Sequence, residues 1–263
     1  MNGLESLQQV ERTCVRWRGR KLIYFSGCDY FRLASHPAIL KAADDGLKKF
    51  GLNVAASRLT TGHHKIYELL ERQLAEFFGA QDALLVPNGY MTGIIVAQAL
   101  AGNFSHALVD ERAHPALLDA ANQFDCPILK FKHRDAGDLA RAIKVAQASC
   151  LFKQAGSLRH YRPIVLTDGM FSHDGSVAPL KNYLKCVPRD GMILMDDAHG
   201  AGVLGKTGKG APEFENVSRR QIIQCVTLSK AFGVFGGVIL GMRDLREKIL
   251  SRSRAFIGST PLP

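Results

Sequence analysis

The sequence has few of the features that mark secreted, zinc-binding or membrane proteins. It contains six cysteines and one tryptophan in 263 residues, and no cysteines form a CxxC pair or a zinc-spaced Cys/His set. Scattered cysteines in a chain of this length are typical of free thiols in a reducing compartment. The N-terminal MNGLESLQQVER has no apolar stretch suited to a signal peptide, and no run of about 18 apolar residues could span a membrane. We therefore expect a cytoplasmic protein with no membrane span.

Acidic residues are the minority among the charged ones. The chain has 34 Lys and Arg against 24 Asp and Glu, which gives a formal net charge of +10. A basic balance favours anionic partners, such as nucleic acid, acidic membrane surfaces or phosphorylated small molecules. The densest basic stretch, Arg12–Lys21, is not interleaved with several aromatic residues, so we expect a solvated face and no nucleic-acid partner.

Helical and strand-like patterns alternate from residue 36 onward, and 46% of the residues are hydrophobic. This arrangement predicts an α/β fold with a mainly parallel sheet and helices on both faces. Functional residues should therefore gather at the carboxyl ends of the strands. The segment Ser149–Arg162 is expected to be part helix and part loop. The predicted strands are 83–86, 106–109, 127–131, 163–167, 192–195, 222–228 and 236–241, and the predicted helices are 36–50, 65–78, 89–100, 115–124, 136–148, 180–186 and 243–254.

A lysine, Lys230, follows the apolar strand in VTLSKAFGVFGG. Burial disfavours the charged form of an amine, and the neutral amine is a better nucleophile toward an aldehyde. Thr227 and Ser229 place hydroxyl groups around it. Taken alone, the motif favours a lysine in a surface loop.

Two carboxylates, Asp196 and Asp197, end the strand in ILMDDAHGAGVLG, and His199 follows them. Buried carboxylates need a cationic partner. One interpretation is a divalent metal site. Another is a carboxylate paired with the protonated ring nitrogen of pyridoxal phosphate (PLP), which keeps that ring an electron sink. The third is that one or both acids face solvent in a turn.

Three further segments place polar residues after strands. VPNGYMTG puts Gly89 at a helix start, where free N–H groups bind phosphate, although it is neither a P-loop nor a GxGxxG motif. His114 lies between a strand and a helix, where it could stack on a planar ring or simply begin the helix. The loop in LTDGMFSHDGSVAPL, which contains Ser172, could close over a bound ring or be an ordinary loop.

Together these segments resemble the α-oxoamine synthases, a family of fold-type I PLP-dependent enzymes. The resemblance runs from about Gly19 to Pro263 and is strongest in DDAHGAGVLGKTGKG, TLSKAFG and TDGMFSHDGSVAPL. It implies PLP as the cofactor, no metal, and a decarboxylating condensation of an amino acid with an acyl-CoA that releases CoA and CO₂. It also implies an N-terminal arm over residues 1–35 and a PLP-binding large domain over residues 36–263.

The resemblance assigns roles around the cofactor ring. Lys230 would hold PLP as a Schiff base and later act in proton transfer at Cα. Asp196 would pair with the ring nitrogen, and His199 would lie near the phenolic oxygen with Ser172 close by. His114 would stack on the ring. The catalytic residues implied are thus Lys230, His199 and Asp196.

The resemblance also assigns the phosphate contacts. Gly89 and Tyr90 would offer backbone N–H groups, and Thr227 its hydroxyl. Thr260, in FIGSTPLP, matches a family position that reaches the phosphate of the neighbouring subunit, so a homodimer is implied.

The sequence also departs from the family pattern, mainly on the substrate side. In SGCDYFRL, Cys28 replaces an asparagine and Arg32 a glycine, and a frequent histidine becomes Tyr67. Family members continue for roughly a hundred residues into a small α/β domain, which carries an arginine for the substrate carboxylate. The alternatives are therefore another PLP enzyme of the aminotransferase class I/II fold, or a truncated non-catalytic chain or partner subunit.

Overall fold

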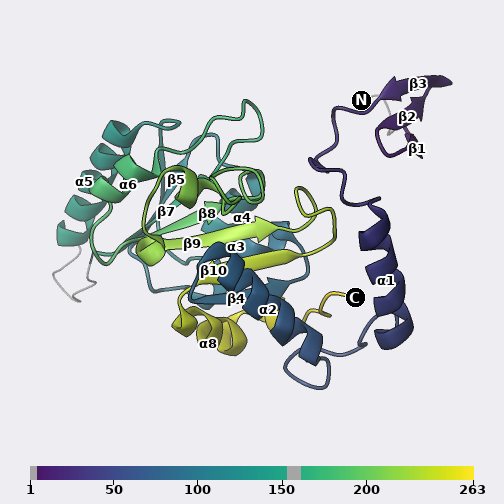
Figure 1. The fold of residues 1–263 in the computed structure, drawn as a ribbon. Helices are drawn as coiled ribbons and strands as arrows, with labels where there is room; N and C mark the ends of the chain where they lie inside the picture. The colour runs from purple at the N-terminus through teal and green to yellow at the C-terminus, as the bar shows by residue number, and fades with distance from the viewer. Residues whose placement is uncertain (1–4, 153–160) are drawn as a thin grey trace.

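The computed structural model describes residues 5–152 and 161–263. Its main body is built on a seven-stranded sheet with strand order β4-β10-β9-β8-β7-β5-β6 (Figure 1). Strands β5 to β9 are parallel, whereas β10 is antiparallel to both of its neighbours, β4 and β9. The prediction of a mainly parallel α/β sheet is therefore confirmed. The strands are β4 (Asp82–Val86), β5 (His106–Asp110), β6 (Ile128–Phe131), β7 (Pro163–Asp168), β8 (Met192–Asp196), β9 (Ile222–Thr227) and β10 (Gly237–Gly241).

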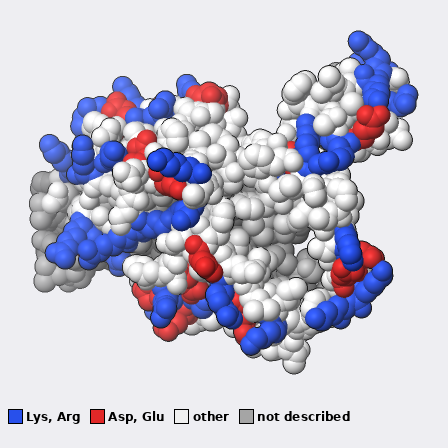
Figure 2. Space-filling view, in the orientation of Figure 1, with Lys and Arg blue, Asp and Glu red and all other residues white. Residues whose placement is uncertain are grey.

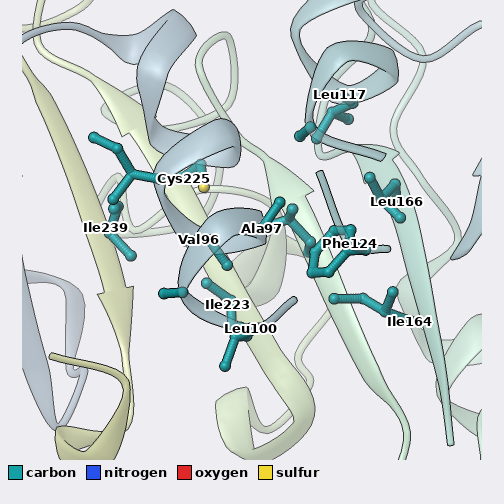
Figure 3. Close-up of a cluster of buried hydrophobic side chains, with 14 of the residues drawn as sticks. Val96, Ala97, Leu100, Leu117, Phe124, Ile164, Leu166, Ile223, Cys225 and Ile239 are labelled. Atoms are coloured by element: carbon teal, nitrogen blue, oxygen red, sulfur yellow. The ribbon is translucent and has the colours of Figure 1, made fainter. Parts of the chain in front are cut away.

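Successive residues of the central strands face opposite layers of helices, as the pleat of a strand requires. Ile164 and Leu166 of β7 belong to a cluster that contains α3, α4 and α8 side chains, part of which is drawn in Figure 3. Val165 lies in a second cluster with residues of α5 and α6. The helices are α2 (Lys65–Phe78), α3 (Gly89–Ala99), α4 (Pro115–Ala121), α5 (Ala136–Phe152), α6 (Leu180–Cys186) and α8 (Arg243–Arg252).

The segment before the main body forms a small sheet and a helix that lie to one side of it (Figure 1). The antiparallel sheet β1-β2-β3 comprises Gln8–Glu11, Cys14–Trp17 and Arg20–Ile23, and it falls within the predicted N-terminal arm. Helix α1 (Pro37–Phe50) begins at His36, whose side chain accepts a hydrogen bond from the Ala38 N–H, and it contains no buried residue.

The observed elements differ from the predicted ones in a few places. The strands β1 to β3 and the short helices α7 (Ala211–Phe214), η1 (Arg219–Gln221) and α9 (Arg254–Ile257) were not predicted. Helix α4 ends at Ala121 instead of residue 124, and α5 continues to Phe152. Within the predicted helix–loop segment Ser149–Arg162, residues 153–160 lie outside the described residues.

A separate expectation concerned the membrane. In the part of the chain that the structure describes, every helix is too short or too polar to cross a bilayer.

Candidate active site

A cavity of about 250 Å³ lies at the carboxyl ends of the parallel strands. The order of the strands reverses direction at this point, since β6 lies on one side of β5 and β7, β8 and β9 follow on the other. Open α/β sheets bind ligands at such a switch point. The residues that line the cavity are Asn88, Gly89, Tyr90, His114, Asp168, Met170, Asp196, Ala198, His199, Thr227, Ser229 and Lys230.

A larger cavity of about 690 Å³ lies at the opposite ends of the strands. It is lined by Ile222, where β9 begins, and by Gly241, where β10 ends, together with Lys209, Arg219 and Glu213. None of the site residues that the sequence predicts lines it, so the smaller cavity is the candidate active site.

The first turn of α3 forms one wall of the smaller cavity. Asn88 is its N-cap, and the Asn88 side chain accepts a hydrogen bond of 3.0 Å from the Met91 N–H. The N–H groups of Gly89 and Tyr90 precede that bond and have no partner within the helix. Thr227 lies against them, because a Cβ on Gly89 would be only 2.7 Å from the Thr227 Cβ. The predicted phosphate contacts thus lie together at a helix N-terminus, which favours anions.

A chain of three polar side chains begins at the cavity residues Lys230 and His199 and continues to Tyr30, which lies outside the cavity lining. The Nζ of Lys230 lies 2.6 Å from Nε2 of His199, and Nδ1 of His199 lies 2.6 Å from the Tyr30 hydroxyl. Burial lowers the pKa of Lys230, although the negative charge of Asp196 opposes this. Burial, with the positive charge of Lys230, lowers the pKa of His199 to about 4. The imidazole is therefore neutral near pH 7 and joins the amine to the phenol through one donor and one acceptor nitrogen.

Asp196 and Asp197 lie in different environments, one at the cavity and the other in the protein interior. Asp196 lines the cavity and accepts a 3.0 Å hydrogen bond from the Ala198 N–H, and burial raises its pKa. Asp197 is fully buried and absent from the cavity lining; its Oδ2 accepts from the Ala211 N–H at 3.0 Å and from Gln224 at 2.5 Å. Because the two carboxylates do not converge, the alternative of a metal site on Asp196, Asp197 and His199 gains no support from the geometry.

Asp168 is a cavity residue that the sequence analysis did not single out. It ends β7, is 4% exposed, and its Oδ1 accepts a 3.0 Å hydrogen bond from the His114 N–H. Burial raises its pKa to about 8, helped by the negative charges of Asp196 and Asp110. Its position at the end of a buried strand, next to Gly169, was the available signal. Through this bond it fixes the backbone of His114, whose ring faces the cavity.

Two predicted site residues do not line this cavity. Ser172 is exposed in the loop after β7, although Met170 of the same loop reaches the cavity. Thr260 is exposed near the C-terminal end of the chain. Their contacts with a cofactor remain predictions, and for Thr260 the predicted contact is to the other subunit.

Tyr30 is a second residue that the sequence analysis missed, although it lies inside the discussed segment SGCDYFRL. Neighbouring Arg32 adopts a left-handed backbone with φ of 55°. A glycine adopts that conformation without strain, which gives a physical reason for the glycine that the resembled motif has there. The Arg32 guanidinium donates a hydrogen bond to the carbonyl of Tyr24. This bond stabilises the fold of the chain between Tyr24 and Arg32.

Comparisons with known proteins identify the family of this chain. Residues 20–263 match the family model for aminotransferase class I and II. The 8-amino-7-oxononanoate synthase of Thioalkalivibrio sulfidiphilus is 37% identical over 247 residues, which are 93% of this chain and 60% of that protein. The synthase of Hahella chejuensis is 36% identical over 95% of this chain and 60% of its own length. The chain thus spans about 60% of the length of these curated relatives.

Solved structures show the same fold. Serine palmitoyltransferase of Sphingomonas wittichii superposes with a TM-score of 0.87 at 25% identity, over 97% of this chain and 62% of that one. The S. paucimobilis enzyme, solved with a bound PLP–myriocin aldimine, gives a TM-score of 0.86 at 25% identity over 98% and 63%. The fold is that of the large domain of fold-type I PLP-dependent transferases. The chain belongs to the aminotransferase class I and II family, and its relatives place it among the α-oxoamine synthases that its motifs resemble.

Proposed function

We propose that this chain binds PLP through Lys230 and that it forms the cofactor-binding part of an α-oxoamine synthase. The observation that carries the proposal is the convergence of an amine, a half-buried carboxylate and a helix N-terminus on one cavity. These three groups match the aldehyde, the ring nitrogen and the phosphate of PLP.

The residues present fit that cofactor. The free N–H groups of Gly89 and Tyr90 and the Thr227 hydroxyl suit a phosphate. Asp196 is partly exposed to the cavity, and no cationic group among the described residues is hydrogen-bonded to it. A protonated ring nitrogen would offset the free-energy cost that burial imposes on its charge. His114, the N-cap of α4, lines the cavity, which supports a role for its ring in stacking on the planar ring of PLP.

When bound, PLP supplies an electron sink for a carbanion at the Cα of an amino acid. The residues of this chain do the rest. Lys230, whose amine loses its proton more readily than an exposed lysine, is the nucleophile toward the aldehyde and the base at Cα. Neutral His199 orients that amine through its 2.6 Å contact, and Tyr30 fixes the His199 ring.

The substrates that we propose are an amino acid and an acyl-CoA, condensed with loss of CO₂ and free CoA. The support is the identity of 35–37% to several proteins named 8-amino-7-oxononanoate synthase over most of this chain. The net charge of +10 suits substrates and cofactors that carry phosphate.

We also propose that the chain forms a homodimer in the cytoplasm. Helix α1 supports the dimer, because Leu40, Leu47 and Phe50 on one face are 54%, 48% and 39% exposed. An apolar helix face of this kind is typical of an interaction surface. All six cysteines are free thiols, which supports a reducing compartment.

The first experiment tests the cofactor. Purified protein mixed with PLP should gain an absorbance band near the visible edge, and borohydride reduction should leave a pyridoxyl label on Lys230, identified by mass spectrometry. Lys230→Ala should show neither, whereas Lys206→Ala, at an exposed lysine of a nearby loop, should behave as wild type. A label spread over surface lysines without preference for Lys230 would contradict the proposal.

The second experiment tests the reaction separately. PLP-loaded protein is incubated with glycine, alanine or serine and a panel of acyl-CoA thioesters, and free CoA and CO₂ are measured. Release of both, dependent on Lys230, supports the synthase. A Lys230 label with transamination of the amino acid and no CoA release would keep the cofactor and replace the reaction with that of another enzyme of the same fold.

A further inference from the structure

Two loops bring two histidines and a carboxylate together at a place where none of the three lines the candidate active-site cavity. His133 lies just after β6, and His173 and Asp174 lie in the loop between β7 and α6. One ligand atom from each of the three lies within 4.8 Å of the others. In the part of the chain that the structure describes, this is the one such group of His, Cys, Asp or Glu residues.

His133 is held in the orientation of a metal ligand. Its Nδ1 lies 3.0 Å from Oδ1 of Asp110, which is fully buried at the end of β5. The other ring nitrogen, Nε2, is buried and has no hydrogen-bond partner among residues 5–152 and 161–263, while the side chain is 14% exposed. A histidine that donates one N–H to a carboxylate and leaves the other nitrogen free is the arrangement that supports bound zinc in proteins. A buried nitrogen without a partner also costs free energy, which a ligand would recover.

The Asp110 carboxylate is itself fixed by the backbone. It accepts hydrogen bonds of 2.9 Å from the Arg112 N–H and 3.0 Å from the Arg134 N–H. The buried Phe171 ring packs edge-on against the His133 ring, with centroids 4.4 Å apart. His133 therefore has little freedom to turn its Nε2 toward another partner.

The remaining two residues are on the surface side of the group. His173 and Asp174 are 39% and 43% exposed, and Nε2 of His173 lies 3.3 Å from Oδ2 of Asp174. The Ser176 N–H donates to Oδ1 of Asp174 at 2.9 Å, which orients the carboxylate. A positively charged side chain contacts this group, because Nη1 of exposed Arg112 lies 3.3 Å from Nε2 of His173.

We propose that His133, His173 and Asp174 form a binding site for a divalent transition metal of the zinc type. Two imidazole nitrogens and one carboxylate oxygen suit Zn²⁺ or Co²⁺, whereas Mg²⁺ and Ca²⁺ prefer sites made of oxygen alone. The fourth position faces solvent, and the Arg112 guanidinium has to leave when the metal binds. Sequence spacing gave no hint of this site, because His133 is far along the chain from His173 and only the fold joins them.

The bound metal would tie the turn after β6 to the loop after β7. That loop sends Met170 to the active-site cavity and carries Ser172 two residues further on. Metal binding would thus restrain a loop of the candidate active site from outside it. This inference does not depend on the identity of the cofactor or the reaction.

The test uses the full chain without a histidine tag. Zn²⁺ is titrated by calorimetry, and Co²⁺ is titrated in parallel to detect the visible bands of a four-coordinate site. His173→Met should weaken the tightest site at least about tenfold and abolish the Co²⁺ bands. His36→Asn, which removes a histidine elsewhere and keeps a helix-capping side chain, should leave both unchanged.

A second variant guards against effects on folding. Arg112→Gln removes the competing positive charge from an exposed position and should tighten Zn²⁺ binding several-fold, which a damaged fold would not do. Equal Zn²⁺ affinity in wild type and His173→Met, or Arg112→Gln that binds no more tightly than wild type, overturns the proposal. In the first case the metal would be bound elsewhere on the chain.

Discussion

At the scale of single residues, Gly89 shows how closely the cofactor site is packed. Its missing side chain lets the start of α3 approach the end of β9, and an added Cβ would lie 2.7 and 2.9 Å from Cβ and Oγ1 of Thr227. We expect Gly89→Ala to move the helix start away and to weaken PLP binding about tenfold or more, with a loss of about 1–3 kcal/mol in stability. Fluorescence titration with PLP measures the affinity. The matched control is Gly46→Ala in α1, where a Cβ would meet nothing within 4 Å; equal PLP affinity in Gly89→Ala and wild type would contradict the assignment.

Asp168 makes the stability of the PLP-free protein depend on pH. Its pKa is raised to about 8 in the folded chain, against about 3.9 in an unfolded one. The folded state therefore binds the extra proton between these values, so this stabilising contribution is present below pH 4 and is lost as pH rises through 8. We expect the free energy of unfolding to fall between pH 5.5 and 8.5, on the order of a few kcal/mol at most.

Asp168→Asn separates this effect from those of other acids. The amide oxygen can still accept from the His114 N–H but does not titrate. Denaturant unfolding at the two pH values should show a weaker pH dependence in the variant than in the wild type. If the two proteins lose stability in parallel, Asp168 is not the titrating group.

Single residues were predictable where a motif named them and the chain placed them at or just after the carboxyl end of a strand. Lys230, Asp196, Gly89 and Thr227 all meet that condition, and all line the cavity. Tyr30 could not be found in this way, because its contact with His199 joins segments 169 residues apart and depends on how the N-terminal segment folds back.

At the scale of elements, the buried strands were the best predicted part of the fold. They are continuous apolar runs between polar turns, as expected when helices cover both faces of a sheet. The strands β1 to β3 escaped prediction, since only Val15 among their residues is buried and the segment is dominated by charge. Helix ends were less accurate because capping geometry, and not periodicity, decides where a helix stops.

Glu71 of α2 connects several elements of the main body. It is 4% exposed and accepts from Arg58 at 2.6 Å, from Arg246 of α8 at 3.1 Å, and from the Leu85 N–H of β4 at 2.8 Å. Glu71→Gln removes the charge that balances two arginines, so we expect a loss of about 3–5 kcal/mol of stability. Chemical denaturation measures this loss in the free energy of unfolding.

The matched control is Glu68→Gln, at an exposed position on the same helix, which should change stability by less than about 0.5 kcal/mol. Similar values for both variants would show that the buried ion pairs of Glu71 contribute little.

At the scale of the whole molecule, the main body and the N-terminal segment with α1 differ in how many hydrophobic side chains they bury. The main body has a continuous core, whereas α1 has no buried residue and lies to one side of it (Figure 1). Lys and Arg lie beside Asp and Glu on α1 (Figure 2), where Lys41 pairs with Asp45 and Lys48 with Asp44, so the charged residues of this helix largely balance each other. In the dimer that we propose, the apolar face of α1 would pack against a second copy of the chain. Thr260 would then reach the cavity of the partner, whereas it does not line the cavity of its own chain.

The proposed dimer predicts complementation between two defective chains. Lys230→Ala destroys the anchor in its own site, and Thr260→Val removes a phosphate contact from the partner's site. In a mixed dimer one site has neither group, while the other has Lys230 from one chain and Thr260 from the other. We expect PLP titration of the refolded mixture to show a class of sites with wild-type affinity that neither variant shows alone.

A mixture that gives only the sum of the two separate variants would mean that Thr260 does not act across a dimer interface. The same mixture prepared with Leu47→Glu in both chains should lose the restored sites, because a charge on the apolar face of α1 opposes the association on which they depend.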